Sequence, residues 1–227
     1  MTQVYRYELH AHTKEVSRCS LISAVDLVRV YKDLGFHGVC ITDHFLNGNT
    51  VVSRQLPWEE QVAAFCQGYE LAYQEGKKLG IDVYFGWEYS YWGSDFLTFG
   101  LDKEWLLAHP EIMQMSLKQY CDFVRAQGGY IVHAHPFRED EWIEMIRLIP
   151  RHVDAVEVVN ICRKDFENQM AYQYAQNYGL AMCAGSDNHE GKLPRLCGVE
   201  LDHRVDSIQA LLGAIIKGEA KIFVQNT

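Results

Sequence analysis

Two histidines separated by a single residue lie near the start of the chain, where His10 and His12 fall in the run Glu-Leu-His-Ala-His. In an extended strand, residues two positions apart project on the same side, so both imidazoles can reach one metal ion. A chain with ten histidines can contain such a pair by chance. The pair therefore indicates a metal site only if other ligand-type residues accompany it.

Four further segments end with residues of these types. In chain order they are Thr-Asp43-His44, Gly-Trp-Glu88, His133-Ala-His135-Pro and Gly-Ser-Asp187-Asn-His189. Each has an ordinary alternative. Asp43 can cap a turn beside a surface His44, a terminal Glu can be solvated, and either His133 or His135 can be the one that faces inward. Carboxylates with imidazoles suit zinc, manganese or iron, and the five motifs together predict a site for divalent metal.

The motifs fall where predicted strands end. Short β-rich apolar runs alternate with longer helical patterns, as in mostly parallel α/β proteins. The expected strands are residues 5–10, 38–42, 82–88, 96–101, 130–135, 155–160, 180–185 and 221–224. Because an α/β barrel collects its active-site groups at the C-terminal ends of its strands, this order would bring the motifs together.

Helical patterns separate the strands, and glycines follow several of them as C-terminal caps. The expected helices are residues 23–34, 57–79, 116–127, 140–149, 164–178 and 207–216. About seven strand and helix units favour a closed or nearly closed barrel over an open sheet. Since no linker or fixed-period repeat interrupts them, residues 1–227 are expected to form a single domain.

The composition limits the partners and the location. The chain has 227 residues, of which 48% are hydrophobic and 22% charged, with a formal net charge of −9. This acidic balance, with Lys and Arg scattered, argues against a long nucleic acid as partner. No apolar run approaches the roughly 20 residues of a membrane span, and the first residues lack signal-peptide features. We therefore expect a cytoplasmic protein without a membrane partner; no pattern indicates an oligomeric state.

The cysteines form no recognisable site. Seven are present, an odd number, and no two are spaced as Cys-x-x-Cys, so neither a disulfide framework nor a thiolate zinc site is expected. Cys19 stands apart because it lies in a polar loop close behind the first His motif. It is a candidate reactive thiol, although free cysteines more often serve as small hydrophobic residues in packing.

The order H-x-H, T-D-H, lone Glu, A-H-P and G-S-D-x-H resembles the polymerase and histidinol phosphatase (PHP) family of metal-dependent phosphoesterases, over nearly the whole chain. The resemblance implies a distorted, seven-stranded (β/α)7 TIM-like barrel that holds two or three divalent ions (Zn, Mn or Fe). It also implies three sets of ligands: His10, His12, Glu88 and Asp187 for one ion, Glu88 and His135 for a second, and His44 with His189 for a third. Asp43 would orient the ligating imidazoles.

Two positions depart from the family pattern. Arg18 stands where many members place an Asp or His ligand, and Glu15 is the nearest residue able to replace it. Many members also have a His after the bridging Glu, where this chain has Asp95. Asp95 can ligate the second ion, or it can be a turn residue before the strand that begins at Phe96.

The resemblance implies hydrolysis of phosphate esters by a metal-activated hydroxide. The leading expectation is a small-molecule phosphomonoesterase, similar to a histidinol phosphatase, that acts on a small phosphorylated substrate. Arg138, in His-Pro-Phe-Arg, is the first choice to bind the phosphate, ahead of Arg195, Lys192 and Arg18. The alternatives are a nuclease or nucleotidase that acts on short nucleotide ends, and a non-catalytic metal-binding regulatory domain.

Overall fold

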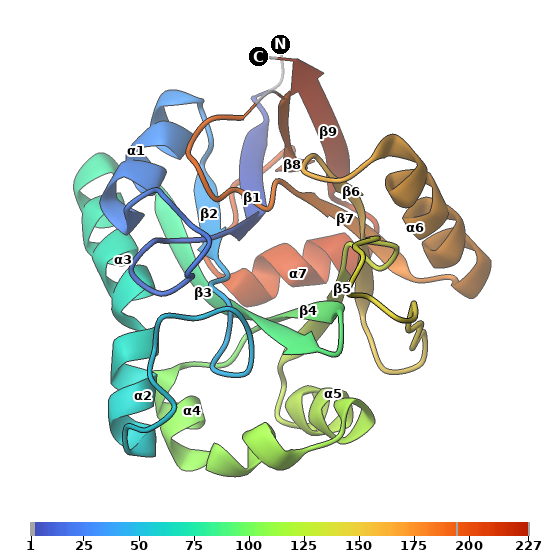
Figure 1. Cartoon of the computed structure of the whole chain (residues 1–227). Coiled ribbons are helices and arrows are strands. Elements are labelled where there is room, and N and C mark those ends of the chain that lie inside the picture. The colour runs from blue at the N-terminus through green and yellow to red at the C-terminus, as the bar shows by residue number, and fades with distance from the viewer. Residues whose placement is uncertain (1–2, 194, 227) are drawn as a thin grey trace.

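Nine strands form one sheet that curls into a nearly closed barrel (Figure 1). The computed structural model describes residues 3–193 and 195–226. The strands are β1 (Tyr5–Ala11), β2 (Gly38–Ile41), β3 (Asp82–Tyr91), β4 (Ser94–Phe99), β5 (Tyr130–Ala134), β6 (Ala155–Asn160), β7 (Ala181–Gly185), β8 (Arg195–Leu201) and β9 (Lys221–Asn226). The helices are α1 (Ala24–Asp33), α2 (Trp58–Phe65), α3 (Gln67–Leu79), α4 (Lys103–Ala108), the 3-10 helix η1 (Pro110–Gln114), α5 (Leu117–Ala126), α6 (Asp165–Tyr178) and α7 (Ile208–Ile216).

The strand order is β7-β6-β5-β4-β3-β2-β1-β8-β9. The β1–β2, β2–β3, β5–β6 and β6–β7 pairs are parallel. The β3–β4, β4–β5, β1–β8 and β8–β9 pairs are antiparallel. The parallel strands therefore place their C-terminal ends on one side of the barrel, the side where α/β barrels build their active sites.

The barrel closes where the chain leaves β7 and passes beside the end of β1. The His12 amide donates to the Asn188 carbonyl at 3.0 Å, and the Asn188 amide donates to the His10 carbonyl at 3.3 Å. Gly185, the last residue of β7, makes this approach possible. A Cβ at that position would lie 2.5 Å from both the His10 Cβ and the Glu157 Oε1.

The apolar core fills the barrel below the strand ends. Leu9, Leu97 and Val132 from the strands belong to one buried cluster with Leu211 and Ile215 of α7, the helix seen through the barrel in Figure 1. Burial of such side chains from water is the main favourable contribution to folding. Because apolar side chains fill the interior, the polar residues that could bind a ligand lie at the C-terminal ends of the strands.

The structure corrects the expected (β/α)7 pattern. The described residues form nine strands rather than seven, β4 runs antiparallel between β3 and β5, and β8 was not expected from the sequence. Strand β4 runs antiparallel because it is joined to β3 by a short hairpin turn, which does not leave room for a crossover helix. The helix expected over residues 57–79 is two helices that meet at Cys66.

The helix expected over residues 140–149 is absent, because this segment contains turns without a regular element. Trp142 and Met145 there are 61% and 55% exposed. A helix of about ten residues is marginal in water unless its apolar face packs on a core. In this segment Ile149 packs on the core, but Ile146 and Leu148 are exposed as well. Separately, no helix in the described part of the chain is both long and apolar enough to span a membrane.

Candidate metal centre

Five residues from four separate strands meet at the C-terminal end of the barrel. They share complete or nearly complete burial and ligand-type side chains, and they are His10, His12, Glu88, His135 and Asp187. The ligand atoms form overlapping groups within 4.8 Å of one another, which are His10–His12–Glu88 and His10–His135–Asp187. The structure therefore brings together the residues that the family resemblance assigns to two adjacent ions.

Both carboxylates lie between imidazole nitrogens. Asp187 Oδ1 lies 3.3 Å from His12 Nε2 and 3.5 Å from His10 Nε2. Glu88 Oε1 lies 3.4 Å from His10 Nε2 and 3.1 Å from His135 Nε2. The Nε2 atoms of His10 and His12 make no hydrogen bond within the part of the chain that the structure describes. Buried polar atoms without hydrogen bonds are uncommon, and here they surround a point that a cation can occupy.

Glu88 is the most central of these groups. Burial alone would raise its pKa, but the charges of His44 and His10 outweigh burial and hold the pKa of Glu88 well below its usual range. Its second oxygen, Oε2, lies 2.6 Å from His44 Nδ1. A buried carboxylate held as an anion between two sets of imidazoles is suited to bridging neighbouring cations.

Two of the candidate ligands have unusual backbone conformations. His135 has φ of 26° and Asp187 has φ of 54°, and both belong to the left-handed region that residues other than glycine rarely adopt. His135 is also followed by a proline, which restricts its backbone further. Such strain is retained where the surrounding structure requires it, and it is concentrated at functional sites. Both residues turn directly after their strands, toward the shared cluster.

Glu157, at the middle of β6, orients His10 from inside the barrel. Its Oε1 lies 2.9 Å from His10 Nδ1, and its Oε2 accepts a hydrogen bond from the His135 amide at 3.0 Å. A carboxylate only accepts, so Nδ1 of His10 carries a proton, and Nε2 is the nitrogen left to bind a metal ion. A carboxylate behind a ligating imidazole is the usual arrangement at metal sites. The sequence interpretation missed this residue.

Asp43 and Ser17 orient His12 in a similar way. The Ser17 hydroxyl donates to Asp43 Oδ1 at 2.7 Å and lies 3.1 Å from His12 Nδ1. Because the single hydroxyl proton goes to Asp43, the imidazole must donate to the hydroxyl oxygen, which leaves His12 Nε2 with its lone pair. Asp43 also accepts from the Thr13 amide at 2.6 Å. The structure thus places Asp43 behind the imidazole, and Ser17 is the link that the sequence interpretation missed.

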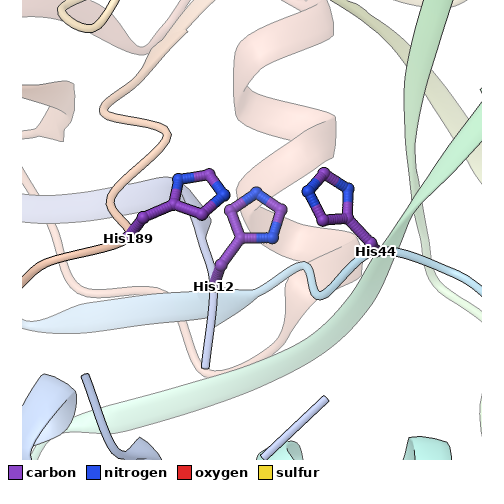
Figure 2. Close-up of side chains that lie close together, drawn as sticks. All are labelled: His12, His44 and His189. Carbon is purple, nitrogen blue, oxygen red and sulfur yellow. The ribbon is translucent and has the colours of Figure 1, made fainter. Parts of the chain in front are cut away.

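A second imidazole cluster lies beside the first. His12, His44 and His189 come from three different segments, and Figure 2 shows their rings side by side with His12 in the middle. The ring centroids are 4.5 Å apart for His12 and His44, and 4.2 Å apart for His12 and His189. His189 Nδ1 lies 2.8 Å from the Asp187 carbonyl, to which it donates, so its Nε2 is the atom that can ligate.

Asp95 and His133 are placed by the β4 and β5 strands. Asp95 forms a group within 4.8 Å with Glu88 and His135, as the sequence suggested for a second ion. The carboxylate also lies 3.0 Å from Arg138 Nη1. His133 is the outward neighbour, since its ring packs 4.6 Å from Phe96, and burial lowers its pKa to about 3.

The structure corrects the expectation for Glu15. Its carboxylate accepts from the Ala24 amide at 3.0 Å at the start of α1, and it takes part in none of the metal-type groups among the described residues. Arg18 also turns away from the cluster, because its guanidinium donates to the Thr50 carbonyl at 3.1 Å. Both side chains therefore lie apart from the groups that could hold a metal ion.

A cavity of about 520 Å³ opens above the clusters. Glu88, Asp187, His44 and His189 reach it from the barrel, and cationic and aromatic side chains complete its wall: Arg138, Arg163, Trp92 and Trp142. Arg138, the expected phosphate ligand, lies here but is paired with Asp95 and stacked at 4.9 Å over the Trp142 ring. The Nε of Arg163 makes no hydrogen bond within the described ranges. No motif in the sequence distinguished Arg163.

Comparison with known proteins agrees with this geometry. The PHP domain family model matches residues 8–224, whereas no curated protein sequence matches the chain. A two-domain protein from Bacteroides vulgatus, described as containing a predicted PHP-like metal-dependent phosphoesterase, has a TM-score of 0.70 and 18% identity. That match covers 98% of this chain but only 65% of the length of the two-domain protein.

Two further solved structures share the fold. PsfC from Pseudomonas syringae has a TM-score of 0.60 at 16% identity, and the match covers 99% of this chain and 91% of PsfC. An amidohydrolase from Chromobacterium violaceum, solved with bound sulfate and no metal, has a TM-score of 0.61 at 15% identity, over 96% of this chain and 97% of that one. At such identities the likeness concerns the fold.

The barrel and its buried clusters of carboxylates and imidazoles define a class, the α/β barrels whose strand ends carry side chains able to hold metal ions. Since the family model covers nearly the whole chain, the protein belongs to the PHP domain family.

Proposed function

We propose that the protein hydrolyses small phosphomonoesters with the help of two or three divalent ions of zinc, manganese or iron. The observation that carries the proposal is the sharing of Glu88 between two ligand groups, His10–His12 on one side and Asp95–His135 on the other. A carboxylate shared by two ligand sets is the arrangement expected of neighbouring ions, and paired ions favour displacement at phosphorus.

The donor set fits the ions proposed. Imidazole nitrogens and carboxylate oxygens suit zinc, manganese and iron, and the hydrogen bonds behind His10 and His12 leave the coordinating nitrogens free. Bound divalent ions would supply a nucleophile at neutral pH by lowering the pKa of water to about 7, and would neutralise charge on the phosphoryl oxygens. No protein nucleophile is then required.

The residues around the cavity would hold and orient the substrate. Arg163 lines the cavity and makes no ion pair among the described residues, so its guanidinium is the side chain best placed to bind a phosphate oxygen. Arg138 is committed to Asp95 at 3.0 Å, so its role would be to position that carboxylate. The volume of about 520 Å³ is within the usual range for a small-molecule pocket.

A nucleotidase that acts on mononucleotides or short nucleotide ends is the second candidate. Trp92 and Trp142 are 78% and 61% exposed, yet both line the cavity. Exposed indoles at a pocket can stack on a planar base, and such stacking is worth about 1–3 kcal/mol per base. This feature favours an aromatic leaving group over an aliphatic one.

Release of inorganic phosphate after metal loading tests the proposal. The metal-stripped chain, supplied in turn with zinc, manganese or iron, should hydrolyse an aryl phosphate, and Asp187→Asn should lose this turnover. Mononucleotides and single-stranded oligonucleotides assayed in parallel distinguish the two candidates. An absence of turnover on all these substrates with every metal would refute both, and would favour a non-catalytic metal-binding role.

A further inference from the structure

The thiol of Cys19 lies at the open side of the cluster formed by His12, His44 and His189. Cys19 Sγ is 3.2 Å from His44 Nε2, and Cys19, His44 and His189 all line the cavity. Five of the seven cysteines are buried, whereas Cys19 and Cys162 are exposed. The Sγ of Cys19 is thus a soft donor atom beside imidazole nitrogens. The cysteine spacing in the sequence had predicted no thiolate site.

The loop after β1 holds the thiol in this place. The Leu21 amide donates to the His189 carbonyl at 2.8 Å, and the Ser20 hydroxyl donates to the same carbonyl or to that of His12. On the other side of the thiol, the Arg18 amide donates to the Asn49 carbonyl at 2.9 Å. Hydrogen bonds on both sides of Cys19 keep its backbone beside the imidazoles.

The same loop explains why Arg18 is not a ligand. Ser17 pairs with Thr50 in an isolated antiparallel bridge, and the Arg18 side chain turns outward to the Thr50 carbonyl. Arg18 and Cys19 are the central residues of a turn, closed by a hydrogen bond from the Ser20 amide to the Ser17 carbonyl at 3.0 Å, and Cys19 faces the cluster. Cys19 therefore lies where the family pattern would place a ligand at position 18.

The three imidazoles of this cluster also form a group that could hold a metal ion, because one ligand atom of each lies within 4.8 Å of the others. His12, which belongs to both clusters, is completely buried, and its Nε2, 3.3 Å from Asp187 Oδ1, makes no hydrogen bond among the described residues. Its Nδ1 is satisfied by Ser17, so Nε2 carries a lone pair with no proton to accept nearby. Leaving a buried polar atom unpaired costs free energy that a bound metal would recover.

We propose that Cys19 supplies a thiolate ligand to a divalent ion that is also held by the Nε2 atoms of His44 and His189. The S–H bond breaks as the sulfur–metal bond forms, and the proton is released to solvent. A thiolate with two imidazoles favours zinc over manganese, because manganese prefers oxygen donors. This inference rests on the proposed metal centre, but it concerns binding rather than turnover.

Cobalt binding gives a direct readout of the sulfur ligand. Metal-stripped full-length protein titrated with Co²⁺ should develop a thiolate-to-cobalt charge-transfer band in the near ultraviolet. The band should be lost in Cys19→Ser, together with about one bound ion per chain, and it should persist in Cys162→Ser, the other exposed cysteine. Far-ultraviolet circular dichroism checks that both variants fold.

Alkylation provides a second test, which uses the chain without substitutions and therefore does not depend on how a variant folds. Zn²⁺ should protect Cys19 from iodoacetamide, as measured by mass spectrometry of its peptide, while Cys162 should react equally with and without the ion. A charge-transfer band in Cys19→Ser, or equal alkylation of Cys19 in both conditions, would overturn the proposal. A chain that forms the band but releases no phosphate would contradict only the proposed hydrolysis.

Discussion

At the scale of single residues, buried carboxylates decide which nitrogen of each imidazole is available. Glu157 lies behind the His10 imidazole and also accepts from the His135 backbone amide, and it is enclosed in the barrel with 1% exposure. Hydrogen-bonding partners of this kind fix the tautomer and raise the basicity of a ligand. The ligand set therefore depends on residues that would never touch the ion.

Glu157→Gln tests this dependence while conserving size. An amide can donate to Nδ1 of His10, which would shift the proton to Nε2 and block coordination. We expect metal affinity to fall about 10- to 100-fold, as measured by competition with a chromophoric chelator, and turnover to recover partly at high metal concentration. Glu200→Gln, at the partly exposed surface of β8, should leave affinity unchanged. Equal affinity in Glu157→Gln and the unmodified chain would contradict this role.

The two arginines of the cavity should behave differently. Arg163→Ala removes a guanidinium from the cavity wall, so KM for a phosphomonoester should rise about 10- to 100-fold, as expected for loss of a charge-assisted hydrogen bond. Arg138→Ala instead frees Asp95, so it should lower the number of bound ions. Steady-state kinetics and metal analysis separate these effects. A change in ion content with unchanged KM in Arg163→Ala would show that its role was misjudged.

At the scale of elements, contact between β7 and β1 brings the last acidic motif to the first His motif. Gly185 permits this contact, since any Cβ there would press against the His10 Cβ. The strand ends can meet only because one of them lacks a side chain. The same contact positions Asp187 and His189 immediately afterward.

Gly185→Ala should therefore destabilise the protein. Overpacking of a filled interior costs about 1–3 kcal/mol, and we expect the free energy of unfolding in urea to fall by this amount. Gly213→Ala is the matched control, because a Cβ there meets no atom within 4 Å and the position lies inside α7. A helical alanine should stabilise by up to about 1 kcal/mol. Equal effects of the two substitutions would contradict the packing argument.

The segment 140–149 shows how an element can be misjudged from its pattern. Its apolar residues recur at intervals that favour a helix, but Trp142 and Met145 lie largely in solvent. Trp142 instead packs under the Arg138 guanidinium at the cavity wall. Periodicity reports which residues could share a face, whereas the surrounding structure decides whether that face has anything to pack against.

At the scale of the whole molecule, one end of the barrel gathers buried charged and polar groups, and some of their atoms have no hydrogen-bond partner among the described residues. Glu88 and Asp187 are buried among imidazoles, and the Nε2 atoms of His10 and His12 remain without hydrogen bonds in the described structure. Burying charged and polar groups in this way opposes folding. Bound ions would relieve this cost, so the metal centre should contribute to global stability.

Thermal unfolding should depend on metal for this reason. At an ion concentration about 100 times Kd, one site stabilises the folded state by about 2.7 kcal/mol, which corresponds to a rise in Tm of about 5–10 °C for a chain of this size. Calorimetry with zinc or manganese after chelator treatment measures the shift. The His10→Ala/Asp187→Ala double variant should show little of it, and a full shift in that variant would place the stabilising ion elsewhere.

The sequence by itself determined the chemistry of the centre and the general form of the fold. H-x-H, T-D-H, the lone Glu88 and S-D-x-H are local patterns, and their side-chain types limit what they can bind regardless of how the chain folds. Alternation of strands and helices was also readable, because periodicity follows from the geometry of each element. The strand ends were therefore recognisable as the place where these motifs would meet.

Only the tertiary structure decided the remaining features. The direction of β4, the addition of β8 and the closure at Gly185 depend on contacts between distant segments. Glu157 is one acid within an apolar strand, and nothing local reveals that it faces His10. Whether Arg18 or Cys19 faces the cluster of His12, His44 and His189 depends on one residue of register in a loop, next to the bridge between Ser17 and Thr50. Such pairings join segments that are distant in the sequence, so a local sequence pattern cannot predict them.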